Sequence, residues 1–135
     1  MTWQPSDASP APPTAGYCVR DLFFSVRITE GLARLGLGSR EIRGNDPGPL
    51  LLGCAMVIVD LSGTQEQWRP VIVAARAVGL PVLAFGSHMD QERWQEARRA
   101  GAGRIVAKSL LVQRFPELVQ AALEGRTAGK EARSR

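Results

Sequence analysis

The segment CAMVIVD, residues 54–60, is the feature that most restricts the fold of this chain. It is an almost unbroken run of apolar and β-branched residues, and its length suits a strand better than a helix. Strands that are apolar on both faces occur in parallel sheets that helices cover on both sides. The segment therefore predicts an α/β fold in which a carboxylate, Asp60, ends a deeply buried strand.

Strand-like and helix-like segments alternate on both sides of this run. The pattern predicts strands at residues 17–21, 38–44, 54–60, 80–86 and 102–108, and helices at residues 22–36, 64–79, 90–101 and 115–125. Residues 45–53 are short and rich in Pro and Gly, so an irregular turn or two of helix is expected there. Strands that alternate with helices imply right-handed crossovers and a doubly wound sheet.

Length and composition indicate one domain with one core. The chain has 135 residues, of which 44% are hydrophobic. Residues 1–16 are rich in Pro, Ala, Ser and Thr and are expected to be disordered, residues 17–124 to form the domain, and residues 125–135 to form a basic tail. No run approaches the ~20 apolar residues of a membrane span and the N-terminus lacks a secretory signal, which predicts a cytoplasmic location without membrane contact.

The net charge of +4 arises largely at the end of the chain, where residues 125–135 hold four basic residues against one acidic residue. A short basic tail is typical of a solvated chain end, and no predicted helix carries a basic stripe with interleaved aromatic residues. We therefore expect no nucleic-acid partner. Cys18 and Cys54 lie far apart and outside any CxxC pattern, so the sequence indicates neither a disulfide framework nor a zinc site.

Polar residues follow several of the predicted strands at the point where each strand ends. Because the carboxyl ends of parallel strands lie at one edge of a sheet, these residues are expected close together. They are Arg20, Asp21, Asp60, Ser87 and Lys108. Two carboxylates and a lysine at one edge suit a hard cation or a phosphoryl group, although each residue alone would be an ordinary solvated strand end.

The order of elements resembles the receiver domain of bacterial two-component response regulators. The resemblance covers roughly residues 17–124 and rests also on VIVDLSG (57–63), LPVLAFGS (80–87) and GAGRIVAKS (101–109). It implies a flavodoxin-like fold, with a doubly wound five-stranded parallel sheet in the order 2-1-3-4-5 and helices on both faces.

The same resemblance implies roles for individual residues. Asp60 matches the phospho-accepting aspartate and Lys108 the lysine that contacts the phosphoryl group. Asp21 matches the second of the two acids that hold Mg²⁺ together with the phospho-acceptor. Receivers commonly engage partners through the face that contains the fourth helix and fifth strand, which makes Trp94 and Ile105 candidate interaction residues.

The sequence departs from the family pattern at the positions that carry the chemistry. Arg20 replaces the first metal-binding acid, placing a fixed positive charge where Mg²⁺ would bind and within reach of Asp60. Gly86 stands where the family has a Ser or Thr that contacts the phosphoryl group, so Ser87 would have to shift to substitute. Ile105 replaces the aromatic switch residue. Loss of a carboxylate and gain of a cation should weaken Mg²⁺ binding severely.

These departures favour a pseudo-receiver, a non-catalytic signalling module that acts through protein–protein interaction, with a protein partner or as a homodimer. In this interpretation Arg20, Asp60 and Lys108 form a charge cluster that fixes one conformation, and no cofactor and no independent catalytic site are expected. The alternative is a phospho-accepting single-domain response regulator that uses Asp60 with Mg²⁺. A third is a flavodoxin-like domain that binds a small ligand at the same edge, although no loop there has a phosphate-cradling pattern.

Overall fold

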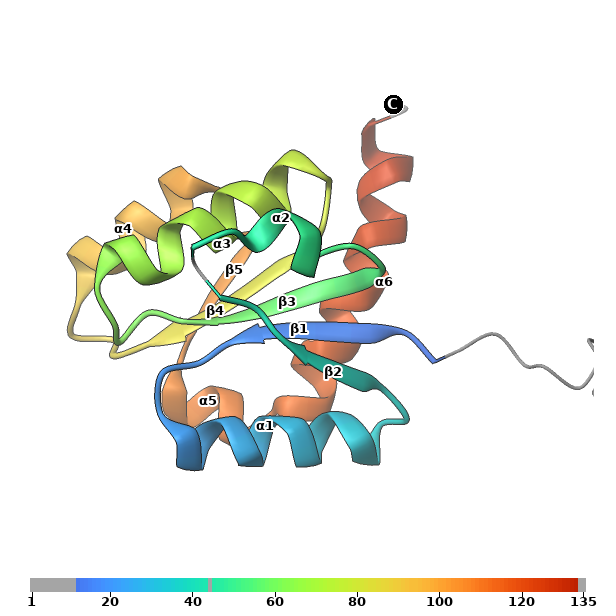
Figure 1. Ribbon diagram of the computed structural model, residues 1–135, viewed down its shortest axis with the longest axis horizontal. Coiled ribbons are helices and arrows are strands. Elements are labelled where there is room, and N and C mark those ends of the chain that lie inside the picture. Colours follow the sequence, from blue (N-terminus) through green and yellow to red (C-terminus); the bar gives the residue numbers. More distant parts are fainter. Residues whose placement is uncertain (1–11, 44, 134–135) are drawn as a thin grey trace, which may run out of the picture.

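The computed structural model describes residues 12–43 and 45–133, except for the side chains of residues 126–133. Within these residues the elements are β1 (Thr14–Cys18), α1 (Leu22–Arg34), β2 (Gly38–Glu41), α2 (Pro47–Leu50), β3 (Cys54–Asp60), α3 (Gln65–Ala77), β4 (Val82–Gly86), α4 (Gln91–Ala100), β5 (Arg104–Ala107), α5 (Lys108–Gln113) and α6 (Phe115–Arg133). The strands form one parallel sheet in the order β2-β1-β3-β4-β5, which confirms the predicted topology (Figure 1).

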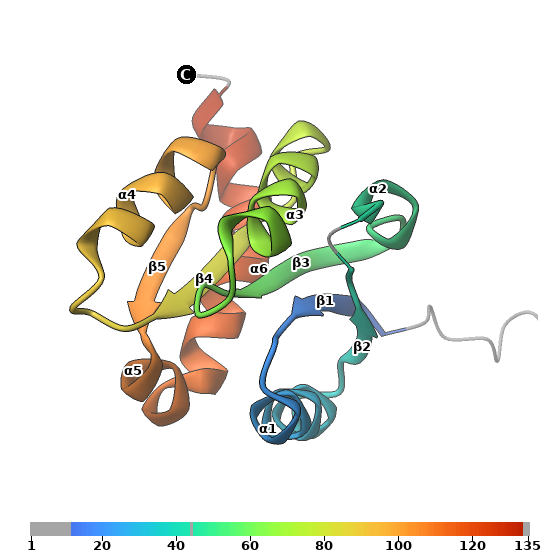
Figure 2. The same ribbon diagram turned by 60° about the vertical axis from the view of Figure 1, so that its left-hand side comes forward.

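Helices cover both faces of the sheet, and each face has its own apolar core. Helices α2, α3 and α4 lie on one side and α1, α5 and α6 on the other (Figure 2). Strand β3 contributes to both cores: Val57 and Val59 face the first group of helices, while Met56 and Ile58 face the second. All four side chains have 0% exposure, so the predicted strand buried on both faces is confirmed.

Helix α1 confirms the helix predicted at residues 22–36 and carries an apolar stripe on one face. Phe24, Ile28 and Leu32 are buried against the sheet. The helix ends just before Gly36, whose φ of 77° lies in the left-handed region that glycine adopts without steric cost. Helix α1 begins at Leu22, shortly after β1 ends at Cys18, so its start lies near the candidate site.

Strand β1 corrects the prediction at residues 17–21. The strand begins at Thr14 and ends at Cys18, so Thr14, Ala15 and Gly16 belong to the sheet rather than to a disordered segment. Ala15 is 1% exposed, and a Cβ on Gly16 would meet the side chain of Ile42 at 2.8 Å. Small residues are needed here because β1 packs closely between β2 and β3. The disorder expected for residues 1–11 lies outside the described part of the chain.

The end of the chain differs from the prediction in two ways. A short helix, α5, begins at Lys108 directly after β5, where the sequence predicted the last residue of a strand. Helix α6 then begins at Phe115, buries Leu118 and Val119, and continues to Arg133 instead of ending near Gly125. The side chains of the predicted basic tail lie outside the described residues. Among the described helices, none combines the length and the apolar character that a membrane crossing requires.

Gly31 lets α1 approach α6 closely. A Cβ at this position would lie 2.8 Å from Cε2 and 2.9 Å from Cδ2 of the Phe115 ring. We predict that Gly31→Ala lowers the free energy of unfolding by about 1 kcal/mol, because overpacking outweighs the gain in helix propensity. Urea denaturation measures the change.

The matched control is the same substitution in a Phe115→Leu background, where the ring edge is gone. There Gly31→Ala should raise the free energy of unfolding by up to about 1 kcal/mol, the helix-propensity gain alone. A stabilising effect of Gly31→Ala in the unaltered chain would show that the ring moves aside freely and would contradict the packing argument.

Candidate functional site

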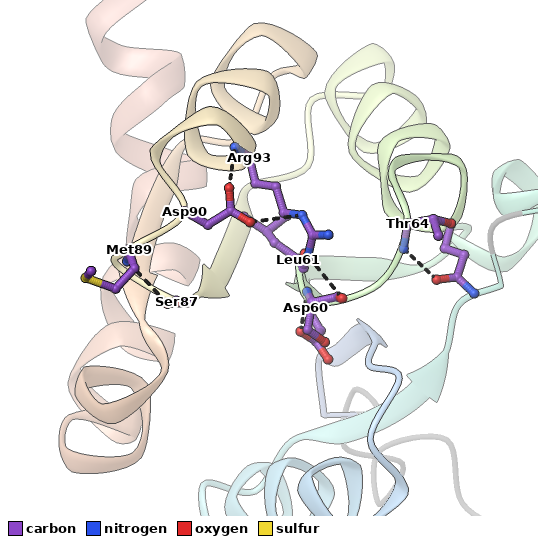
Figure 3. Close-up of polar contacts among 9 residues, drawn as sticks. Asp60, Leu61, Thr64, Ser87, Met89, Asp90 and Arg93 are labelled. Atoms are coloured by element: carbon purple, nitrogen blue, oxygen red, sulfur yellow. Dashed lines mark hydrogen bonds and ion pairs between the residues drawn. The ribbon is translucent and has the colours of Figure 1, made fainter.

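The candidate site lies at the carboxyl edge of the sheet, where β1, β3 and β4 end. Asp60 is the last residue of β3 and pairs in register with Phe85 of β4. Its side chain is only 7% exposed, which is unusual for a carboxylate. Figure 3 shows Asp60 at the start of the loop between β3 and α3, which we call the β3–α3 loop (residues 61–64).

Two backbone amides hold the carboxylate of Asp60. The N–H of Arg20 donates to Oδ2 at 3.3 Å, and the N–H of Ser62 donates to Oδ1 at 2.9 Å. Hydrogen bonds from backbone N–H groups stabilise an ionised carboxylate in the absence of a cation. The loops after β1 and β3 are therefore both fixed to the same side chain.

The predicted charge cluster of Arg20, Asp60 and Lys108 is not formed. Among the described residues, the ion pairs are Arg43–Glu41, Arg93–Asp90 and Arg99–Glu96, and none of them includes Asp60. Arg20 contacts Asp60 through its backbone, while its exposed side chain passes Gly63, with Cδ 3.7 Å from the position of a Cβ there. The sequence does not reveal the direction of the Arg20 side chain, and this direction is the reason why the predicted cluster is absent.

The ammonium group of Lys108 contacts an aromatic ring instead of a carboxylate. Its Nζ lies 4.6 Å from the centroid of the Phe24 ring. Phe24 in turn packs against Phe85, with ring centroids 5.1 Å apart. A lysine ammonium over an aromatic face is a favourable cation–π contact. The first residue of α5 is thereby held against α1, which packs on β4 through Phe85.

Asp21 is engaged as the N-cap of α1. Its Oδ1 accepts from the N–H of Phe23 at 2.9 Å and from the N–H of Phe24 at 3.2 Å. A carboxylate in this role satisfies two of the free amides at a helix start. Among the described residues, no group of three or more His, Cys, Asp or Glu side chains is placed to hold a metal ion. With Arg20 in place of an acid, Asp21 and Asp60 are the acids that remain from the set implied by the receiver resemblance.

The space beside Gly86 is filled by Leu61 of the β3–α3 loop and Trp94 of α4. A Cβ on Gly86 would lie 3.3 Å from Cβ of Leu61 and 3.7 Å from Nε1 of Trp94. The indole N–H is buried and has no hydrogen-bond partner among the described residues. Ser87, the predicted substitute, uses its hydroxyl to accept from the N–H of Met89 at 3.2 Å, away from Asp60 (Figure 3).

Trp94 and Ile105, the predicted interaction residues, are both half-buried. Each packs against the core on the α2–α4 face of the sheet. Much of their apolar surface therefore contributes to the packing of α4. An interaction role for these two residues stays a prediction.

Arg93 is the residue of this edge that the sequence interpretation missed. Its guanidinium donates to the carbonyl oxygens of Leu61 at 2.9 Å and Ser62 at 3.1 Å, and it pairs with Asp90 at 3.1 Å (Figure 3). The spacing of Asp90 and Arg93 on α4 indicates their ion pair. The contacts with the β3–α3 loop carry no local signal, because the acceptors are backbone atoms about thirty residues earlier.

Cys18 lies at the same edge, at the end of β1. Burial, followed by the negative charges of Asp60 and Glu41, raises the pKa of its thiol to about 11. The thiol donates to the carbonyl oxygen of Gln67 across a long distance of 3.9 Å. Because the thiolate is the reactive form of cysteine, Cys18 is chemically protected at neutral pH.

We predict that Cys18 reacts slowly with iodoacetamide at pH 8 and that the rate rises as the pH approaches 11. Asp60→Asn should lower the thiol pKa and speed alkylation at pH 8, because it removes a negative charge that opposes the thiolate. Mass spectrometry in a Cys54→Ala background measures the rate. Glu117→Gln, which removes a carboxylate from α6, is the control, and equal rates in all three proteins would contradict the prediction.

No family model matches this sequence, and no curated protein matches it. Solved structures do. NtrX from Brucella abortus, crystallised with ADP, superposes with a TM-score of 0.75 and 16% identity over 90% of this chain and 29% of NtrX. The chain thus spans less than a third of NtrX.

Separate receiver domains match over almost their whole length. That of the Francisella response regulator 1452 has a TM-score of 0.69 and 13% identity, covering 83% of this chain and 97% of that domain. That of a modulated diguanylate cyclase from Desulfovibrio desulfuricans has a TM-score of 0.73 and 15% identity, covering 87% and 98%. At this identity the likeness concerns the fold. This chain has the doubly wound fold of response-regulator receiver domains.

Proposed function

We propose that this chain is a pseudo-receiver, a receiver-like signalling module that works through protein–protein contact without phosphorylation of Asp60. One observation carries the proposal. Both acids that the receiver resemblance assigns to Mg²⁺ and phosphate chemistry, Asp21 and Asp60, are already bonded to backbone amides. The chain's own backbone supplies the stabilisation that a cation would otherwise give to these carboxylates.

The electrostatics of the edge support the same proposal. Mg²⁺ demands near-octahedral oxygen ligands and is held through carboxylates, and Arg20 offers none. A fixed guanidinium on the same loop also repels a divalent cation. Asp21 would have to leave the N-cap of α1 to bind a metal, which costs about 1 kcal/mol of helix stability. Phosphoryl transfer relies on such a metal to balance developing charge.

The structure around Gly86 supports the loss of conventional switching. The receiver resemblance requires a hydroxyl side chain at this position and an aromatic residue in β5. Here the position is a glycine covered by Leu61 and Trp94, and β5 carries Ile105. No side chain of Gly86 can respond to a phosphoryl group on Asp60.

Exposed apolar side chains beside the site suit contact with a protein. Leu22 and Phe23 at the start of α1 are 79% and 75% exposed, and Val26 one turn later is 47% exposed. Clustered exposed apolar residues mark interaction surfaces more often than isolated ones do. The start of α1 is therefore a better candidate than the half-buried Trp94 for contact with a protein partner or with a second copy of this chain.

Intact-mass measurement after incubation with Mg²⁺ and acetyl phosphate tests the proposal. We predict no stoichiometric phosphate adduct on the unaltered protein. An adduct that disappears in Asp60→Asn would establish the alternative, a phospho-accepting response regulator that uses Asp60 with Mg²⁺.

Arg20→Asp is the informative companion variant, because it restores an acid at the position of the missing ligand. Its affinity for Mg²⁺, followed by NMR shifts of residues 19–21 and 60–62, should exceed that of the unaltered chain. Arg43→Asp makes the same charge change at the end of β2 and should leave Mg²⁺ affinity low. Equal Mg²⁺ affinity in all three proteins would contradict the assignment of Arg20 as the residue that excludes the metal.

A further inference from the structure

One peptide group connects Arg93 to Asp60. The carbonyl of Leu61 and the N–H of Ser62 belong to the same peptide unit. Arg93 donates to that carbonyl oxygen at 2.9 Å, and that N–H donates to Oδ1 of Asp60 at 2.9 Å. In a trans peptide the C=O and the N–H lie in one rigid plane and point in opposite directions, so the guanidinium and the carboxylate bind the two ends of one planar dipole.

A hydrogen bond at one end of a peptide group affects the other end. A charged donor on the carbonyl polarises the amide and strengthens the hydrogen bond that the N–H donates. It also fixes the orientation of the peptide plane, which otherwise rotates with the loop backbone. Arg93 thus acts on the hydrogen bond that Asp60 accepts from Ser62, although no ion pair between the two side chains is found among the described residues.

The guanidinium is itself held in place. It pairs with Asp90 at 3.1 Å, and the carboxylate of Asp90 accepts from the N–H of Arg93 at 3.3 Å as the N-cap of α4. A further contact joins α3 to α4, because the side chain of Gln65 donates to Glu96 at 3.0 Å. The β3–α3 loop and α4 consequently form one hydrogen-bonded unit, and Leu61 of the loop and Trp94 of α4 both lie beside Gly86.

We infer that Arg93 is a positioning residue that couples helix α4 to the carboxylate of Asp60 through the Leu61–Ser62 peptide. Coupling of this kind is reciprocal. A partner that displaces α4 alters the hydrogen bond at Asp60. A change of charge at Asp60 alters the hydrogen bonds that Arg93 donates to the β3–α3 loop. This route does not require a side chain at position 86. It operates whether or not Asp60 accepts a phosphoryl group, so its failure would leave the proposed function standing.

The test compares Arg93→Ala with Arg99→Ala. Arg99 lies on the same helix and also pairs with a residue three positions earlier, Glu96, but it has no hydrogen bond to loop backbone within the described residues. We expect Arg93→Ala to speed hydrogen exchange of the Ser62 amide about tenfold, the loss of one charge-assisted bond, and to move the carboxyl-carbon resonance of Asp60. Arg99→Ala should change neither.

Two results would overturn the inference. One is a folded Arg93→Ala protein with unchanged Ser62 exchange and an unchanged Asp60 resonance. The other is faster exchange throughout α4 with the Asp60 resonance unmoved, which would show that Arg93 only stabilises the helix.

Milder variants keep the test decisive if Arg93→Ala does not fold. Asp90→Asn retains the N-cap and removes the ion pair, and Arg93→Lys retains the charge with a less rigid donor. Both should give Ser62 exchange rates between those of the unaltered protein and Arg93→Ala, or simply above the unaltered rate if Arg93→Ala cannot be measured. The reciprocal measurement is the indole N–H resonance of Trp94, which Asp60→Asn should shift. Unaltered rates and resonances in these three variants would overturn the inference.

Discussion

The buried carboxylate of Asp60 is the group around which this edge of the molecule is built. An ionised side chain at 7% exposure is stable only with hydrogen-bond donors. Here the donors are backbone amides from the loops that follow β1 and β3. The position of Arg20 fixes where α1 can start, and the position of Ser62 fixes the approach to α3. One carboxylate therefore sets the geometry of two neighbouring crossovers.

A buried carboxylate can be stabilised by a metal ion or by hydrogen bonds, and the local sequence decides which. In the receivers that this chain resembles, a second and a third acid share a cation with the phospho-acceptor. In this chain the neighbouring acid, Asp21, caps α1 and the other position is Arg20. The same loops supply amide donors to Asp60, and these donors are the basis of the proposed loss of the metal.

Much of the fold could be predicted from local pattern, and the errors have physical causes. The apolar runs of β3 and β4 and the stripe of α1 identified these elements because their burial leaves a periodic composition. The small residues at the start of β1 resemble a linker in composition. They are needed because β1 packs closely against Ile42 and Val57, which are distant in sequence. Helix α5 was not predicted because it is too short to show the apolar periodicity of a helix.

The sequence by itself determined the α/β class, the sheet order through its resemblance to receivers, and the position of Asp60 at a strand end. It also determined which residue types are missing, since the departures at Arg20, Gly86 and Ile105 are visible in the letters. Only the tertiary structure decided where the charged side chains point. Arg20 passes Gly63, Lys108 lies over Phe24, and Arg93 binds backbone carbonyls of the β3–α3 loop. Strand burial is a local, periodic property, whereas the partner of a long flexible cation depends on groups that only the folded chain brings together.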